Sequence, residues 1–214
     1  MSKLGIIPAA GKANRFGGTF KELLPVSDTE SLLTRTLTFL EEIPTDHNII
    51  ITNPWKYAAH AHTVGDRAEL VEQKDYSRDA WGAIQSSFPH TMDLNYYLMP
   101  DTYTPARSYY GELPEADFVM GLFSTVHPER YGVLWDGAIY DKSDTFNGSI
   151  QMAWGFVSWS KAVVRFWQES PVEIKTHTEA FNLAMKRFGY TTFHMPFYFD
   201  IASMQDYKGL LSHV

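Results

Sequence analysis

The sequence predicts one α/β domain whose central sheet is mostly parallel, with helices on both faces and an antiparallel second half. Its 214 residues fit a single domain. Strand-like and helix-like segments alternate through the first half, which is typical of parallel sheets covered by helices. In the second half, Asp136–Gly137 lies between two short apolar runs and indicates a β-hairpin.

The first half supplies the alternating elements. Ile49, Ile50 and Ile51 are consecutive, as expected for a strand buried on both faces. Leucines recur at helical spacing from Leu32 to Leu40. We expect strands at residues 4–8, 48–52, 69–72 and 95–99, and helices at 31–42, 54–64 and 80–88.

The second half should add strands to the same sheet. The expected strands are 116–123, 131–135, 138–141, 152–158 and 191–195, and the expected helices are 160–169 and 178–188. Neither an internal repeat nor a low-complexity linker interrupts the chain, so one domain over residues 1–214 is the simplest interpretation.

Composition excludes several classes of protein. The net charge is −7 and no stretch is rich in lysine or arginine, which argues against a dedicated nucleic-acid binder. The chain contains no cysteine, so thiol nucleophiles and thiolate metal sites are excluded. No apolar run approaches 18 residues and no signal peptide is evident, so we expect a cytoplasmic protein without a membrane segment.

Residues 5–26 are the most informative stretch: G-I-I-P-A-A-G-K-A-N-R-F-G-G-T-F-K-E-L-L-P-V. A buried strand here leads into a loop of small residues, which lets backbone N–H groups approach a ligand closely. Arg15 and Lys21 add two cations suited to phosphate oxygens. The stretch is neither a P-loop nor a dinucleotide-binding motif, because G-x-x-x-x-G-K-[ST] and G-x-G-x-x-G are both absent.

This stretch resembles the first motif of the sugar-phosphate nucleotidyltransferases, such as the glucose-1-phosphate thymidylyl- and uridylyltransferases. The family pattern is approximately A-[AG]-G-x-G-T-R, a spacer, then P-K-x-[LM]-L-P-[VI]. The chain departs from it at Ala13, Asn14 and Phe20. The matching residues are Ala9, Ala10, Gly11, Arg15, Lys21, Leu24, Pro25 and Val26.

Two aspartates are candidate Mg²⁺ ligands. Asp101 directly follows an apolar strand, and ligands of α/β sheets bind at the carboxyl ends of strands. The family has an aspartate at this point. F-D-I-A-S-M-Q-D-Y, at residues 199–207, resembles the family's D-I-G-T-P-E-D-Y, which supplies a second metal aspartate and matches Asp200. The resemblance therefore extends from Gly5 to Tyr207.

Further residues are candidates by their position in the family pattern. Gln73 ends the third predicted strand, where the family often reads the base, and Asp79 replaces the family's glycine beside the base. Asp79 could instead face solvent and cap the following helix. For the acceptor, the resemblance implies Asp141 and Lys142 as contacts of sugar and phosphate, and Trp154 and Gly155 as pocket lining.

The resemblance implies a three-layer α/β/α fold of the glycosyltransferase-A type and transfer of a nucleoside monophosphate from an NTP to a sugar 1-phosphate. Pyrophosphate would be released and a nucleotide-sugar formed. Mg²⁺ on Asp101 and Asp200 would bridge the phosphates, Arg15 would neutralise pyrophosphate, and Lys21 the incoming or α-phosphate. No room remains for a C-terminal β-helix, so a single-function transferase is expected, and a homo-oligomer stays open.

Three alternatives remain. A cytidylyltransferase acting on a non-sugar phosphate would fit the same loop. A glycosyltransferase on the same fold usually carries a D-x-D metal motif, which the chain lacks. A nucleotide-binding protein without activity is the third, because Ala13, Asn14 and Asp79 depart from the family pattern.

Overall fold

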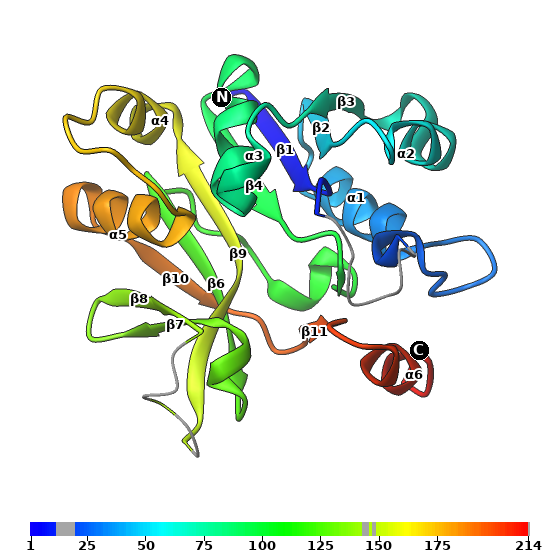
Figure 1. Ribbon diagram of the computed structural model, residues 1–214. Helices are drawn as coiled ribbons and strands as arrows, with labels where there is room; N and C mark the ends of the chain where they lie inside the picture. The colour runs from blue at the N-terminus through cyan, green and yellow to red at the C-terminus, as the bar shows by residue number, and fades with distance from the viewer. Residues whose placement is uncertain (12–19, 143–145, 147–148, 214) are drawn as a thin grey trace.

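The computed structural model describes residues 1–11, 20–142, 146 and 149–213 and shows one twisted sheet between layers of helices (Figure 1). In the described residues the strand order is β10-β6-β9-β4-β1-β2-β3, and the β7–β8 hairpin joins through β9. This confirms the predicted α/β class with a mostly parallel first half and an antiparallel second half.

The parallel half consists of the first four strands. β1 (Lys3–Pro8) lies between β2 (His47–Thr52) and β4 (Leu94–Leu98), and β3 (Glu69–Glu72) is the edge strand. All three pairings are parallel. The carboxyl ends of these strands therefore lie along the same border of the sheet, at the ends of the strands, where the loop after β1 begins.

The second half turns the sheet antiparallel. β9 (Gln151–Ser160) pairs antiparallel with both β4 and β6 (Phe118–Thr125), and β10 (Thr191–His194) pairs parallel with β6. β7 (Gly132–Trp135) and β8 (Ala138–Asp141) form the predicted hairpin. Asp136 and Gly137 have φ of 47° and 73°, as the turn requires.

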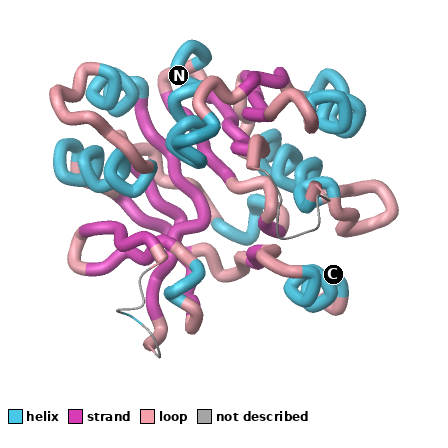
Figure 2. Tube along the Cα trace, in the orientation of Figure 1, coloured by secondary structure: helices cyan, strands magenta, loops and turns pink. Residues whose placement is uncertain are grey.

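Helices cover both faces of the sheet, as Figure 2 shows. α3 (Asp79–Ser87), α4 (Lys161–Gln168) and α5 (His177–Phe188) pack on the face that carries Leu4 and Ile6. α1 (Leu32–Glu42) and α2 (Tyr57–Val64) contribute to the core on the opposite face, which carries Ile7. Alternate residues of β1 thus enter two separate cores, which gives the three layers.

Several helices have clear end signals. Ser31 and Thr34 form a reciprocal capping box at the start of α1, and Thr176 and Glu179 form one at α5. Short 3₁₀ turns complete the connections: η2 (Lys21–Leu23), η3 (Gly65–Arg67), η4 (Tyr76–Arg78), η5 (Phe88–His90), η6 (Arg107–Tyr110) and η7 (Pro128–Arg130). None of the helices in the described ranges is both long and apolar enough to cross a membrane.

The sequence did not predict one pair of strands and the last helix. β5 (Thr102–Tyr103) and β11 (Phe199–Asp200) form a separate antiparallel ladder, followed by α6 (Met204–Leu211). Two-residue strands are too short to show a periodic pattern. The ladder matters because it brings the C-terminal segment to the edge of the sheet where β4 ends.

Candidate active site

The loop after β1 is held from behind by two side chains. Asn53 Nδ2 donates to the Ala10 carbonyl oxygen at 2.7 Å, and Lys56 Nζ donates to the Ala9 carbonyl oxygen at 3.1 Å. Ala9 and Ala10 are buried, whereas Gly11 is exposed, and a Cβ there would meet no atom of the described residues within 4 Å. As far as the chain is described, Gly11 therefore borders open space where a phosphate could approach.

A buried ionic cluster lies behind this loop. Glu22 Oε1 accepts hydrogen bonds from Lys56 Nζ at 2.6 Å and His60 Nε2 at 3.0 Å. The Thr52 hydroxyl bonds the other ring nitrogen of His60 at 2.8 Å. Burial alone would raise the pKa of Glu22, but the His60 hydrogen bond and the Lys56 charge outweigh it and hold the pKa below its usual value. Through Lys56, the cluster links Glu22, the residue after Lys21, to the carbonyl oxygen of Ala9.

Of the two predicted cations, Lys21 lies in the described part of the chain. Arg15, with Ala13 and Asn14, lies outside the described residues. Lys21 begins η2, and its ammonium forms an ion pair with the Asp101 carboxylate. The structure thus brings the lysine of the first motif to the aspartate that follows β4.

Asp101 and Asp200 also lie together, although 99 positions separate them in the chain. Asp200 is opposite Thr102 in the β5–β11 ladder, and the Ile201 N–H donates to the Asp101 carbonyl oxygen at 3.0 Å. Both carboxylate groups are largely shielded, with 14% of the Asp101 side chain and 19% of the Asp200 side chain exposed. The predicted pair of metal ligands is therefore assembled, and its role in metal binding stays a prediction.

Electrostatics at this pair favour a bound cation. Burial, followed by the negative charge of Asp101, raises the pKa of Asp200 to about 6. Arg130 reduces the repulsion, because its Nη2 lies 3.1 Å from Asp200 Oδ2 and 3.2 Å from Asp206 Oδ2. The sequence reasoning missed Arg130, since an arginine in H-P-E-R carries no distinctive spacing.

The donor set fits Mg²⁺. Asp101 and Asp200 offer carboxylate oxygens only, which are the ligands this hard cation prefers. Two shielded carboxylates that repel one another gain from a divalent ion placed between them. Lys21 and Arg130 supply positive charge to the same two groups in the structure.

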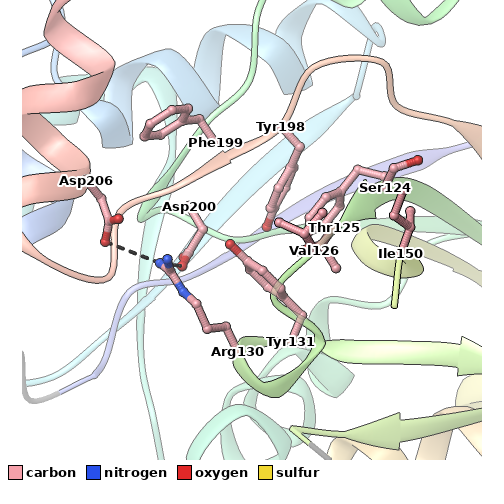
Figure 3. Close-up of a pocket in the computed structure, with 11 residues that line it drawn as sticks. Ser124, Thr125, Val126, Arg130, Tyr131, Ile150, Tyr198, Phe199, Asp200 and Asp206 are labelled. Atoms are coloured by element: carbon pink, nitrogen blue, oxygen red, sulfur yellow. Dashed lines mark hydrogen bonds and ion pairs between the residues drawn. The ribbon is translucent and has the colours of Figure 1, made fainter. Parts of the chain in front are cut away.

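A cleft of about 370 Å³ opens beside Asp200 (Figure 3). Arg130 and Asp206 lie at one end, and Figure 3 shows the rings of Tyr131 and Tyr198 facing the same space. Burial, with the nearby Asp200 charge second, raises the pKa of Tyr131 to about 12, so its hydroxyl stays protonated and can donate. Aromatic walls with a few polar groups suit a small polar ligand.

The predicted base-reading residues lie in a tightly packed loop. Gln73 is buried, and its amide nitrogen donates to the carbonyl oxygens of Asp75 at 2.7 Å and Asp79 at 3.1 Å. That nitrogen therefore supports the loop, and the side-chain carbonyl is the part left to meet a base. Asp79 is the first residue of α3 and is exposed; the N-cap residue is Arg78, so the alternative of Asp79 as the cap is wrong.

Asp79 has an unusual backbone conformation. Its φ of 41° and ψ of −122° lie in a region that glycine adopts freely and other residues avoid. The family pattern has a glycine at this place. The chain thus keeps a glycine-like backbone while presenting a carboxylate.

His177 contacts one predicted acceptor residue, Trp154, and is affected by the charges of two others. Burial lowers the pKa of His177, and the charges of Asp141, Lys142 and Asp79 also act on it. The Trp154 ring contacts the His177 ring at a centroid distance of 5.8 Å. Lys142 has a φ of 43°, and its exposed side chain follows β8. His177 was not predicted, because a lone histidine at a helix start has no chemical spacing.

Gly155 has a packing explanation. A Cβ at this position would lie 2.4 Å from Cε2 of Tyr198, so the glycine lets the tyrosine ring pack against β9. Tyr198 in turn stacks on Phe123 at a centroid distance of 4.2 Å. Gly155 is buried, and it shapes the cleft through Tyr198.

Known proteins resemble this chain in sequence over its first part and in fold over most of its length. Residues 5–109 match the family model described as the MobA-like NTP transferase domain. A comparison with curated proteins gave no significant match. The matched segment includes the loop after β1, Lys21, Gln73, Asp79 and Asp101.

Solved structures extend the likeness of fold over the chain. A protein assigned as a glucose-1-phosphate thymidylyltransferase from Bacillus anthracis superposes with a TM-score of 0.84 at 19% identity, over 99% of this chain and 95% of that one. The inositol-1-phosphate CTP transferase of T. maritima gives 0.75 at 15% identity, over 99% and 95%. UDP-glucose pyrophosphorylase of Acinetobacter baumannii gives 0.75 at 13% identity, over 100% and 93%.

Proposed function

Residues 5–109 match the family model of the MobA-like NTP transferase domain, and from this likeness we propose that the protein transfers a nucleoside monophosphate from an NTP to a sugar 1-phosphate. The observation that carries the proposal is the meeting of Lys21, Asp101 and Asp200 at the edge where β1 and β4 end. These groups come from three distant parts of the chain. The positive charge of Lys21 complements phosphate groups, and the negative charges of Asp101 and Asp200 complement a divalent cation.

The reaction joins two anions, so repulsion is its main barrier. A phosphate oxygen of the acceptor attacks the α-phosphorus and forms a new P–O bond. The bond from that phosphorus to the β-phosphate oxygen breaks, and pyrophosphate leaves with the electron pair. Lys21 and Arg15 would hold and neutralise phosphate oxygens, so catalysis proceeds by positioning and charge compensation without a covalent intermediate.

Mg²⁺ would be held by Asp101 and Asp200. When bound, it supplies positive charge to the phosphate oxygens of both substrates. Lys21, whose ammonium lies beside Asp101, would meet a phosphate oxygen at the same place. Arg130 keeps Asp200 and Asp206 in place from the other side.

Two regions could take the acceptor. Asp141, Lys142, Trp154 and His177 form one, and the aromatic cleft beside Asp200 forms the other. A cytidylyltransferase acting on a non-sugar phosphate is the second candidate function, favoured by the Asp79 carboxylate at the predicted base site. A cyclitol phosphate, as in the name of the T. maritima structure, belongs in any test.

The direct test is a pyrophosphate-release screen. CTP, UTP, dTTP, ATP and GTP would each be offered with glucose 1-phosphate, inositol 1-phosphate and choline phosphate, with and without Mg²⁺. We expect release that requires an NTP, an acceptor and the metal together. Absence of release with all pairs would favour the nucleotide-binding protein without activity.

Replacement of three cationic residues should distinguish the site of phosphoryl transfer from the site that binds the acceptor phosphate. Lys21→Ala and Arg15→Ala should lower kcat, because they touch charge that changes during transfer, by about 2–4 kcal/mol of transition-state stabilisation. Lys142→Ala should mainly raise KM for the acceptor. Steady-state kinetics on the three variants measure this, and a larger loss of kcat in Lys142→Ala than in Lys21→Ala would contradict the assignment.

Asp79→Gly should change both the choice of nucleotide and the stability. We expect the wild type to use CTP at least as well as UTP or dTTP, because a carboxylate accepts a hydrogen bond from the cytosine amine and repels a carbonyl. Glycine should remove this preference and also relieve backbone strain. The net gain in unfolding free energy should be roughly 1 kcal/mol after the entropic cost of glycine.

Asp79→Asn is the matched control for that variant. It removes the charge and keeps the strained backbone, so it should lose the CTP preference without gaining stability. Kinetics with the three triphosphates and urea unfolding measure the two effects. An unchanged nucleotide ranking in both variants would show that Asp79 does not read the base.

A further inference from the structure

A cluster of two histidines and a glutamate lies at the opposite edge of the sheet from the candidate active site. His47 begins β2, Glu69 begins β3, and His90 ends η5 just before β4. The amino ends of parallel strands share one edge, so residues 22 and 21 positions apart in the chain become neighbours. Their spacing along the sequence gave no metal-binding signal.

The donor atoms of the three side chains converge on one point. His47 Nε2 lies 2.9 Å from Glu69 Oε2, and His90 Nδ1 lies 3.5 Å from the same oxygen. All three donor atoms are within 4.8 Å of one another. Ligands in a tetrahedral zinc site, with bonds near 2.0–2.1 Å, are about 3.3 Å apart. The two distances, 2.9 and 3.5 Å, lie on either side of that value.

We propose that His47, Glu69 and His90 form a binding site for a transition-metal ion of the Zn²⁺ class. Two imidazoles and one carboxylate are a ligand set that suits Zn²⁺ and disfavours Mg²⁺, which prefers oxygen. The side chains are 38%, 48% and 25% exposed, so an ion can enter and water can take the fourth position.

The site would act on the fold rather than on the chemistry. It ties the edge strand β3 to β2 and to the segment that leads into β4. A ligand that binds the folded state and not the unfolded chain raises the unfolding temperature. Without an ion, Glu69 Oε2 forms a hydrogen bond with the His47 ring and lies close to the His90 ring, which is the alternative role for the cluster.

Metal titration of the full chain tests the proposal. Zn²⁺ binding would be measured by calorimetry, and Co²⁺ by its visible d–d absorption, which is strong only in tetrahedral sites. The variants are His47→Gln, His90→Gln and Glu69→Gln, each checked by circular dichroism. His127→Gln is the control, because His127 Nδ1 lies 3.3 Å from Glu129 and the described part of the chain places no third ligand beside them.

We expect one strong Co²⁺ site in the wild type and in His127→Gln. Each ligand variant should bind Zn²⁺ at least about tenfold more weakly, lose the Co²⁺ absorption and lose the Zn²⁺-dependent rise in Tm. Asp101→Asn should retain the Zn²⁺ affinity, the Co²⁺ absorption and the Zn²⁺-dependent rise in Tm. Absence of tetrahedral Co²⁺ absorption in the wild type, or its persistence in folded His47→Gln and His90→Gln, would overturn the proposal.

Discussion

Replacement of Asp101 or Asp200 by asparagine is expected to lower Mg²⁺-dependent turnover at least about a hundredfold. Replacement of a residue that only orients a metal ligand already lowers metal affinity or activity by about 10–100-fold, and a direct ligand should matter at least as much. Asp200 lies in the β5–β11 ladder opposite Thr102, Asp101 directly precedes that ladder, and the two carboxylates repel one another. An amide oxygen keeps the shape of the site but supplies no negative charge. Both variants should therefore fold normally and bind the cation weakly.

Thermal unfolding gives a second measure that is independent of turnover. In the wild type, Mg²⁺ should raise Tm, since it neutralises two shielded carboxylates. Without Mg²⁺, Asp200→Asn should unfold at a Tm no lower than the wild type, because the repulsion with Asp101 is gone. A variant with near-normal turnover and a normal Mg²⁺-dependent Tm rise would remove its aspartate from the metal site.

Asp206→Asn is the matched control for this series. Asp206 shares Arg130 with Asp200, and its carboxylate accepts the Ala202 N–H and the Ser203 hydroxyl at the start of α6. Asparagine can still accept these bonds. We expect the Mg²⁺-dependent rise in Tm to persist, which would show that the metal requires the Asp101–Asp200 pair and not every acidic residue nearby.

The parts of the site that the sequence predicted follow short local patterns. Lys21 and Asp101 each occupy a recognisable place relative to an apolar strand, and parallel topology brings such places to one edge of the sheet. Asp200 was identified by its motif, although the strand that holds it has two residues and no period. Local pattern and topology together were sufficient to predict that these residues lie close to one another, and their roles stay predictions.

The remaining residues depend on contacts that no local pattern encodes. Arg130 pairs with residues 70 and 76 positions away, and the charges of Asp141, Lys142 and Asp79 act on His177 only in the fold. Gln73 has the expected position, yet its amide nitrogen supports the loop. A sequence shows which polar groups are available and does not show how their hydrogen bonds are distributed.

The Glu22 cluster is the clearest case. Beside Lys21, Glu22 has the sequence of an ordinary surface residue, yet it is 2% exposed and bound to Lys56 and His60, 34 and 38 positions away. Lys56 is the N-cap residue of α2, shortly after β2. Because β2 is parallel to β1, Lys56 lies beside the loop that follows β1. Burial of these charges follows from the order of the strands.

Glu22→Gln and Lys56→Met should each lower the unfolding free energy by about 3–5 kcal/mol, because each leaves a buried charge without its partner. The double variant should lose less than the sum of the two, since both charges are then removed. Urea unfolding of the four proteins measures the coupling. The exposed pair Glu41–Arg67 is the control, and Glu41→Gln should cost no more than about 1 kcal/mol.

The loss in Glu22→Gln should depend on pH in one direction. The folded pKa of Glu22 lies below its usual 4.5, so its ionic contribution is complete above that pH and is lost as the pH falls through the folded pKa. The difference in unfolding free energy between wild type and Glu22→Gln should therefore be constant from pH 6 to 8 and shrink below about pH 4.5. Because Lys56 also holds the Ala9 carbonyl, both variants should raise KM for the nucleotide. Equal unfolding free energies of wild type and Glu22→Gln at neutral pH would mean that Lys56 does not need the Glu22 charge for stability. An unchanged KM for the nucleotide would mean that the Asn53 hydrogen bond to Ala10 is sufficient to hold the loop.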